Sequence, residues 1–216
     1  FLLCDLSGFN YIKKYLAILI VSNHYHLQFN LDISYSHQEG IKMTSTRYPQ
    51  RVRNDLRFRA LTVLRVERVA AGFQRIVLGG DALEGFSSSG FDDHSKVFFP
   101  EPGATFVPPV VTDEGINWGE GVRPQARDYT PLYDEARHEL VLDFFVHDGS
   151  VASNWALQAK VDDKLTIGGP RGSLVVAEDY AWQLYVCDES GMPALRRRLE
   201  AIAKLPVRPE IHAVVT

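Results

Sequence analysis

The sequence predicts a β-rich domain followed by the opening of an α/β domain. From residue 56 onward, polar and apolar residues alternate with the period of two that is typical of half-buried strands, most clearly along residues 57–69. After residue 180 the pattern changes to a short apolar strand, a helix over 194–204 and a second strand over 211–215. That order is a βαβ unit, which opens a parallel sheet.

Within the first domain, the same alternation predicts further strands at 73–78, 96–99, 127–133, 139–147 and 164–167, and a helix at 150–160. Residues 101–124 are rich in proline and glycine and predict a long loop, which is unusual in a compact domain unless it is functional or mobile. A single βαβ unit does not close a doubly wound sheet, so we expect the second domain to be incomplete.

The composition of the 216 residues is that of an ordinary globular protein, with 45% hydrophobic and 23% charged residues. The net charge of −4 and the lack of a basic stripe argue against a nucleic-acid partner. We interpret Arg196, Arg197 and Arg198 as the solvated face of a helix. The two cysteines, Cys4 and Cys187, lack metal-ligand spacing, so we expect no disulfide framework and a reducing, cytoplasmic location.

The first 42 residues carry few charges, and the chain opens with Phe1 rather than Met. The apolar run at 15–21 is too short to span a bilayer, which takes about 20 residues, so we expect no stable membrane insertion. Met43 opens a segment of ordinary charge density. We therefore predict that residues 1–42 are an upstream or non-native extension without ordered structure. The other predicted boundaries are 43–55 for an N-terminal lead, 56–180 for the first domain and 181–216 for the start of the second.

Arg127, Tyr129 and Thr130 form an R-x-Y-[ST] segment on a predicted strand. Four companion segments occur in a fixed order around it: His94 to Lys96, then His147-Asp148-Gly149 with Ser153 and Trp155, then Gly169-Pro170-Arg171-Gly172-Ser173, then Asp188-Glu189-Ser190. This ordered set resembles the siderophore-interacting proteins, a family of FAD-dependent ferric-siderophore reductases in the ferredoxin–NADP reductase superfamily. The resemblance covers about residues 56–216. The family often carries an arginine two residues after the motif threonine, where this chain has Leu132.

The resemblance implies a six-stranded antiparallel Greek-key β-barrel that binds FAD, followed by a nicotinamide-binding domain that is C-terminally truncated. It implies an enzyme that passes electrons from NADPH or NADH through FAD to a ferric siderophore and releases Fe(II) for iron assimilation. Iron is then the substrate, and we expect no protein-bound metal. We also expect a monomer, and little NAD(P)H oxidation by a chain with half a nicotinamide domain.

The predicted cofactor-binding residues suit the chemistry of FAD. Strand alternation puts Arg127 and Tyr129 on one face, where Arg127 can offer a fork to phosphate and Tyr129 can lie against the isoalloxazine ring. Thr130 can reach the N5 edge. A surface strand with a solvated arginine and an ordinary tyrosine is the alternative for the same residues.

The other site residues are assigned by the resemblance. His147, Gly149 and Ser153 would contact FAD at the start of a helix, where free N–H groups suit phosphate, although simple helix capping remains the alternative. The remaining cofactor residues are Gly169, Arg171, Gly172 and Ser173. Asp188, Glu189 and Ser190 would lie on the nicotinamide side, with helix capping as a compatible role.

On the substrate side the resemblance places Lys96 and His94, and a lysine near the flavin would attract an anionic chelate. Two other functions stay open from the residues alone. One is a general flavin- or ferredoxin-type reductase. The other is a non-catalytic β-barrel that binds a small ligand.

Overall fold

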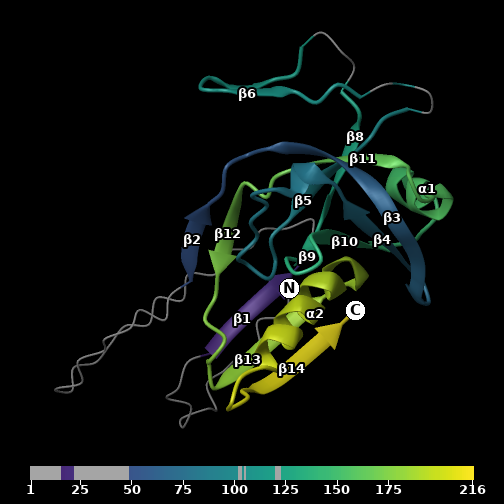
Figure 1. The fold of residues 1–216 in the computed structure, drawn as a ribbon. Helices are drawn as coiled ribbons and strands as arrows, with labels where there is room; N and C mark the ends of the chain where they lie inside the picture. Colours follow the sequence, from purple (N-terminus) through teal and green to yellow (C-terminus); the bar gives the residue numbers. More distant parts are fainter. Residues whose placement is uncertain (1–15, 22–48, 102–103, 105, 120–122) are drawn as a thin grey trace.

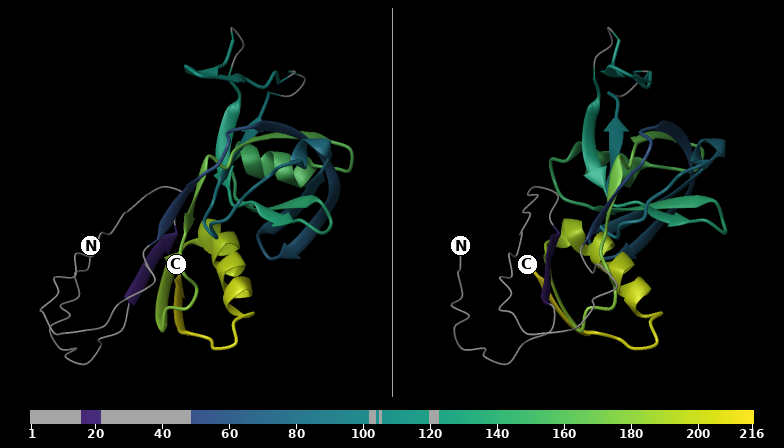
Figure 2. Two further views of the ribbon diagram at one scale, coloured as in Figure 1. Left: turned by 60° about the vertical axis from the view of Figure 1, so that its left-hand side comes forward. Right: turned by 90° about the vertical axis from the view of Figure 1, so that its left-hand side faces the viewer.

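The computed structural model describes residues 16–21, 49–101, 104, 106–119 and 123–216 (Figure 1). Seven strands form one antiparallel sheet in the order β8-β5-β11-β3-β4-β10-β9, which curls into a barrel-like layer (Figures 1 and 2). Their bounds are β3 (Phe58–Ala70), β4 (Phe73–Gly79), β5 (Ser95–Phe99), β8 (Gln125–Tyr129), β9 (Leu132–Asp134), β10 (Glu139–Phe145) and β11 (Lys164–Gly168).

The inner face of this sheet holds the main core, because alternate residues of each strand point to the same side. The buried strand residues include Leu61, Val63, Ile76, Leu78, Val97, Phe99, Leu140, Leu142, Phe144, Leu165 and Ile167. Helix α1 (Val151–Gln158) closes the core with Ala152 and Ala156, and Trp155 packs 5.9 Å from the ring of Phe99. Trp155, which belongs to one of the motif segments, is therefore partly buried against the core.

The antiparallel barrel is confirmed, but the strand predicted over 127–133 is two strands. β8 ends at Tyr129 and β9 begins at Leu132, and the two lie at opposite edges of the sheet. Pro131 between them has no N–H to donate to a ladder, so the chain leaves one strand and starts another. The sheet accordingly has seven strands where six were expected.

Two short strand pairs escaped the sequence analysis. β12 (Gly172–Val175) pairs with β2 (Gln50–Arg53), and β6 (Val110–Thr112) pairs with β7 (Gly115–Asn117) inside the segment predicted to be a long loop. The residues of β2 and β6 are all exposed. Because neither strand buries a face, their sequences do not show the alternation of apolar and polar residues by which a strand is predicted.

The predicted βαβ unit is confirmed as β13 (Trp182–Cys187), α2 (Met192–Ile202) and β14 (Glu210–Val215), with β13 and β14 parallel. β1 (Leu16–Val21) pairs parallel to the other edge of β13, and α2 packs on the sheet next to the barrel (Figures 1 and 2). The expectation of no ordered structure in residues 1–42 does not hold for these six residues. The rest of that segment lies outside the described residues, and its origin stays a prediction.

The solvated-face interpretation of the three consecutive arginines is wrong for Arg198, which is 2% exposed. Its guanidinium donates to Tyr185 Oη at 2.9 Å, to the Val176 carbonyl at 2.9 Å and to the Ala177 carbonyl. Arginine carries five N–H donors and can be buried where oxygen atoms meet them. Among the described residues, no helix has the length and apolar character needed to cross a membrane.

Candidate functional site

The β5–β8 ladder brings the predicted flavin and substrate residues together. In its register Ser95 faces Tyr129, and Lys96 faces Asp128. The Lys96 Nζ lies 2.8 Å from Asp128 Oδ1, in an exposed ion pair. Lys96 therefore stands one strand away from the R-x-Y-[ST] segment, while exposed His94 directly precedes β5.

Arg127 and Tyr129 differ in their surroundings although they lie on one strand. Arg127 is exposed, and its guanidinium donates to the carbonyl of the neighbouring Ala126 at 2.8 Å. The ring of Tyr129 is half-buried, with its centroid 4.2 Å from that of Phe144. Burial raises the pKa of the Tyr129 phenol above its usual value, and the charge of Arg127 opposes this only in part. Tyr129 thus stays neutral at physiological pH.

Thr130 ends the motif at the point where the chain leaves β8. Its side chain is buried, and the following Pro131 is buried as well. The Pro131 carbonyl accepts a hydrogen bond from Arg197 of α2 at 3.3 Å. The turn after the flavin strand is therefore tied to the second sheet.

The turn between β10 and α1 is organised by Ser150 and Ser153. Ser150 is the N-cap of α1, and its Oγ accepts from the Ser153 amide at 3.4 Å. The Ser153 Oγ in turn accepts from the His147 amide at 3.1 Å. The capping role is thereby confirmed, whereas the cofactor contact of His147, Gly149 and Ser153 stays a prediction.

The segment after β11 is held tightly by the backbone. Gly169 has a φ of +92°, a conformation that L side chains rarely adopt, and it precedes a cis peptide bond to Pro170. A Cβ at Gly172 would meet the Val52 carbonyl at 3.0 Å, because β12 and β2 pair closely there. Arg171 between them is exposed.

Ser173 belongs to a buried network that the sequence did not predict. Its hydroxyl donates to Asp93 Oδ2 at 2.6 Å and accepts from Asn54 Nδ2 and the Ser89 amide, each at 3.2 Å. Asp93 is 3% exposed, and Ser88 Oγ also donates to its carboxylate at 2.8 Å. The hydroxyl of Ser173 is thus engaged in joining β12 to the loop before β5.

Asp188 caps the short helix η2 (Glu189–Gly191), as the sequence analysis allowed. Its Oδ1 accepts from the Gly191 amide at 3.2 Å and from Ser190 Oγ at 2.5 Å. These residues follow β13 at the carboxyl end of its parallel sheet, which is where nucleotide sites form in such folds. The nicotinamide role of Asp188, Glu189 and Ser190 stays a prediction.

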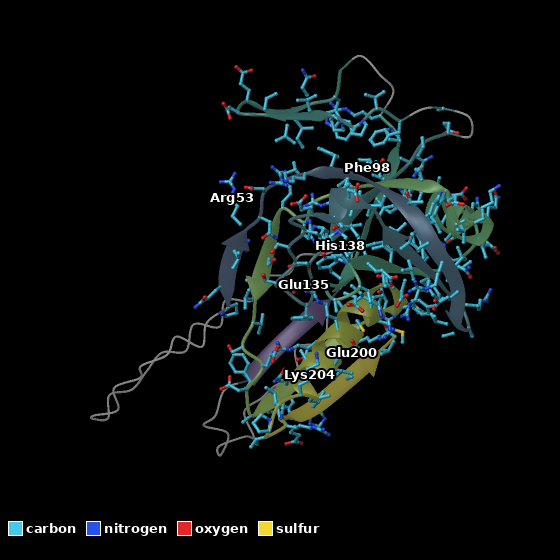
Figure 3. The ribbon with its side chains drawn as sticks, in the orientation of Figure 1. Arg53, Phe98, Glu135, His138, Glu200 and Lys204 are labelled. Atoms are coloured by element: carbon cyan, nitrogen blue, oxygen red, sulfur yellow. The ribbon has the colours of Figure 1, made fainter. Side chains whose placement is uncertain are left out.

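Sequence reasoning missed an aromatic cluster on the outer face of the barrel. The ring of Phe98 stacks on Phe106 with centroids 5.2 Å apart, and Trp118 meets both Phe98 and Phe58 edge-on. Arg123 lies 4.9 Å from the Trp118 ring centroid. Phe98 lies on the side of the barrel that faces the β6–β7 excursion (Figure 3). The only signal was the presence of aromatic residues in a segment rich in proline and glycine.

The described residues fit FAD. The exposed charge of Arg127 is met by a single neutral carbonyl, and the half-buried plane of Tyr129 offers an apolar wall. Among the described residues, no atom lies within 4 Å of the position that a Cβ would take at Gly149, which leaves room for a phosphate beside the start of α1. Within the described ranges, no group of three or more His, Cys, Asp or Glu side chains could hold a metal ion.

The sequence model of the siderophore-interacting FAD-binding domain matches residues 62–174. This chain belongs to that family. The family resemblance of the motifs is confirmed, and so is FAD as the cofactor of the domain.

Curated relatives of the family are similar over much of the chain. The NADPH-dependent ferric-chelate reductase of Escherichia coli K12 is 75% identical over 170 residues, which cover 79% of this chain and 67% of that protein. The ferric vibriobactin reductase ViuB of Vibrio cholerae is 32% identical over 145 residues, which cover 66% of this chain and 53% of that protein. The chain therefore spans between about half and two thirds of the length of these relatives.

Solved structures of the family have the same fold. A siderophore utilization protein from T. fusca gives a TM-score of 0.69 at 32% identity, covering 77% of this chain and 63% of that chain. The siderophore-interacting protein SipS from Aeromonas hydrophila gives a TM-score of 0.57 at 28% identity, covering 74% of this chain and 58% of that chain.

Proposed function

We propose that this chain is the flavin-binding part of an NADPH-dependent reductase of ferric siderophores. The observation that carries this proposal is the β5–β8 ladder, which sets the Lys96–Asp128 pair beside Arg127 and Tyr129. The 75% identical E. coli protein, named an NADPH-dependent ferric-chelate reductase, supports it. The substrate, a bulky and often anionic chelate, needs both an electron source and a cation within reach.

Three residues of β8 and its end would hold the flavin. Arg127 would offer charge-assisted hydrogen bonds to the pyrophosphate, Tyr129 would pack against the isoalloxazine, and Thr130 would reach its N5 edge. When bound, FAD supplies the redox chemistry, because it accepts hydride from a nicotinamide and gives single electrons to ferric iron. Because the pKa of Tyr129 is raised by burial, its ring presents an uncharged plane.

The start of α1 would receive the phosphate side of the cofactor. Ser150 caps α1 by accepting from the Ser153 amide, and the remaining N–H groups at the helix start lack intrahelical acceptors, which would suit a phosphate. His147 is exposed at the entrance of this turn. On the other side, Asp188 and Ser190 at the end of β13 would meet the nicotinamide dinucleotide.

The substrate side combines one cation with an adjacent carboxylate. Lys96 attracts an anionic chelate toward the flavin, and Asp128 partly neutralises that attraction because the two side chains are paired at 2.8 Å. Lys96 and Phe98 share one face of β5, so the aromatic cluster around Phe98 adjoins the lysine. We also propose that the protein is a cytoplasmic monomer, since the relative's donor NADPH is a cytoplasmic reductant.

Flavin binding and electron delivery test the proposal separately. The purified chain should take up added FAD and turn yellow, and a photoreduced sample should be reoxidised by a ferric siderophore with formation of Fe(II). A colourless chain that ignores added FAD would favour the small-ligand barrel. Equal rates with ferricyanide, ferredoxin and ferric siderophore would favour a general reductase.

A further inference from the structure

A cavity of about 240 Å³ lies between the start of β3, the loop after the short helix η1 (Asp81–Leu83) and the Gly169–Pro170 turn. Its charged lining consists of three arginines, Arg53, Arg57 and Arg59, against one carboxylate, Asp55. Arg53 at the end of β2 is labelled in Figure 3. The cavity is therefore strongly cationic.

Arg59 is the unusual member of this lining. Its side chain is 4% exposed, and its Nε is a buried donor with no hydrogen-bond partner. The guanidinium lies 5.5 Å from the centroid of the Phe86 ring, which shields it but offers no oxygen. Burial, together with the charge of Arg57, lowers the pKa of Arg59, yet an arginine remains protonated at neutral pH.

A buried cation without a counter-charge is costly, and proteins normally pair it. No ion pair among the described residues involves Arg53, Arg57 or Arg59. Arg53 and Arg57 are exposed at the mouth, whereas Arg59 lies at the floor. This arrangement lets an anion enter from solvent between Arg53 and Arg57 and reach the Arg59 side chain, which lines the cavity.

The cavity adjoins Gly169, one of the predicted cofactor residues, but its three arginines do not lie on the flavin strand β8. In the sheet order, β3 with Arg59 is separated from β8 with Arg127 by β5 and β11. The frame of the cavity is fixed by the backbone, since the Gly169 amide donates to the Arg57 carbonyl at 3.1 Å.

We propose that this cavity is a binding site for a small oxyanion, a phosphate or carboxylate group, held by the Arg59 guanidinium at its floor and by Arg57 and Arg53 at its mouth. A cavity of this size holds several water molecules. It therefore has room for inorganic phosphate or a small polycarboxylate. Phosphate-bearing and carboxylate-bearing ligands share the chemistry that recognises them here.

The test is calorimetric titration of the FAD-saturated chain with phosphate and, separately, with citrate at constant ionic strength. Saturation with FAD keeps the probes out of the flavin site. Binding to the wild-type chain should weaken at least tenfold in Arg59→Met, which keeps a long apolar side chain against Phe86. It should also weaken severalfold in Arg57→Met at the exposed mouth, and stay unchanged in Arg137→Met, an arginine in the exposed β9–β10 turn.

Nitrogen-15 spectra of the arginine Nε groups provide a second measurement in case Arg59→Met folds poorly. The Arg59 Nε resonance of the wild-type chain should move on addition of phosphate or citrate. A preference for phosphate would identify a phosphate-bearing ligand, and a preference for citrate a carboxylate. The proposal is overturned if neither probe moves that resonance, or if Arg57→Met binds both probes as the wild type does.

Discussion

The guanidinium of Arg197 donates a hydrogen bond to the backbone carbonyl of Pro131 at 3.3 Å. The same side chain donates to Ser88 Oγ at 2.8 Å and to the Ser88 carbonyl. Arg197 lies on α2, and Pro131 directly follows Thr130 at the end of the flavin strand. One side chain therefore joins the second sheet to the turn that would face the flavin N5 edge.

Replacing Arg197 by methionine should loosen this connection. The change removes charged donors from Ser88 and Pro131, and hydrogen bonds to charged groups are worth about 1.5–3 kcal/mol. We expect a lower melting temperature and faster proteolysis after β12. The control is Arg137→Met. Its partner Asp134 is exposed, so we expect the stability to change by no more than about 0.5 kcal/mol. Equal stability of the two variants would contradict the connection.

Ser173→Ala separates the structural role of this serine from the predicted cofactor contact. The buried carboxylate of Asp93 loses a donor at 2.6 Å, and an unsatisfied buried group costs about 1–3 kcal/mol. Denaturant unfolding should show this loss, while the FAD dissociation constant of the folded variant should match the wild type. A weaker FAD affinity with unchanged stability would restore Ser173 to the cofactor site.

The substrate side should respond to charge on Lys96. Lys96→Glu should raise KM for an anionic ferric chelate with photoreduced flavin as the donor, and Asp128→Asn should lower it by freeing the lysine. Both effects should shrink between 0.1 M and 1 M salt, because the Debye length falls from about 10 Å to about 3 Å. The kcat should change less, since attraction felt equally in ground and transition states acts on KM. A KM for Lys96→Glu equal to that of the wild type at low salt removes Lys96 from the substrate site.

The Arg65–Glu139 ion pair should make the stability of the fold depend on pH in the acid range. Hydrogen bonding from Arg65 holds the pKa of the Glu139 carboxyl below its usual value of 4.5. A group with a depressed pKa in the folded state contributes stability that is present above its unfolded pKa and lost as the pH falls through the folded one. The melting-temperature difference between wild type and Glu139→Gln should therefore persist above pH 4.5 and shrink below it. Glu135→Gln, at an exposed position, is the control. A melting-temperature difference between wild type and Glu139→Gln that does not vary with pH would contradict this role of the ion pair.

Arg127→Ala should weaken FAD binding by roughly 10- to 100-fold, since a charge-assisted contact is worth about 1.5–3 kcal/mol. Fluorescence titration with FAD measures the affinity directly. Arg137→Ala is the matched control, because its side chain is 70% exposed in the turn after β9. Wild-type affinity in Arg127→Ala would show that the arginine of the motif is merely solvated.

The sequence predicted the elements whose burial is one-sided. β3, β10 and α1 each bury mainly one face against the core, and that burial produces their apolar period. The family resemblance placed Lys96 near the flavin, and the structure adds that its strand pairs with the strand of Arg127 and Tyr129. What the sequence could not show depends on contacts between distant segments. Arg198 is satisfied by carbonyls that lie 21 and 22 residues earlier in the chain, and Phe98 is covered by rings from an irregular excursion.

The cavity lined by Arg53, Arg57 and Arg59 could not be predicted from the sequence for a related reason. Arg57 and Arg59 look like the polar positions of an alternating strand, and nothing local distinguishes the exposed Arg57 from the buried Arg59. Only the packing of Phe86 over Arg59 decides which of them is enclosed. Ser173 was assigned to the cofactor by the family resemblance, and its hydrogen bond to Asp93 could not be predicted because Asp93 is 80 residues away in the chain.

The central claim is that this chain binds FAD along β8 and delivers its electrons to chelated iron. Anaerobic mixing of the photoreduced, FAD-loaded chain with a ferric siderophore tests it most directly, with flavin absorbance and a ferrous-iron indicator followed together. We expect the yellow flavin band to return at the same rate at which the indicator binds Fe(II). A flavin that stays bleached while the chelate stays ferric would contradict it.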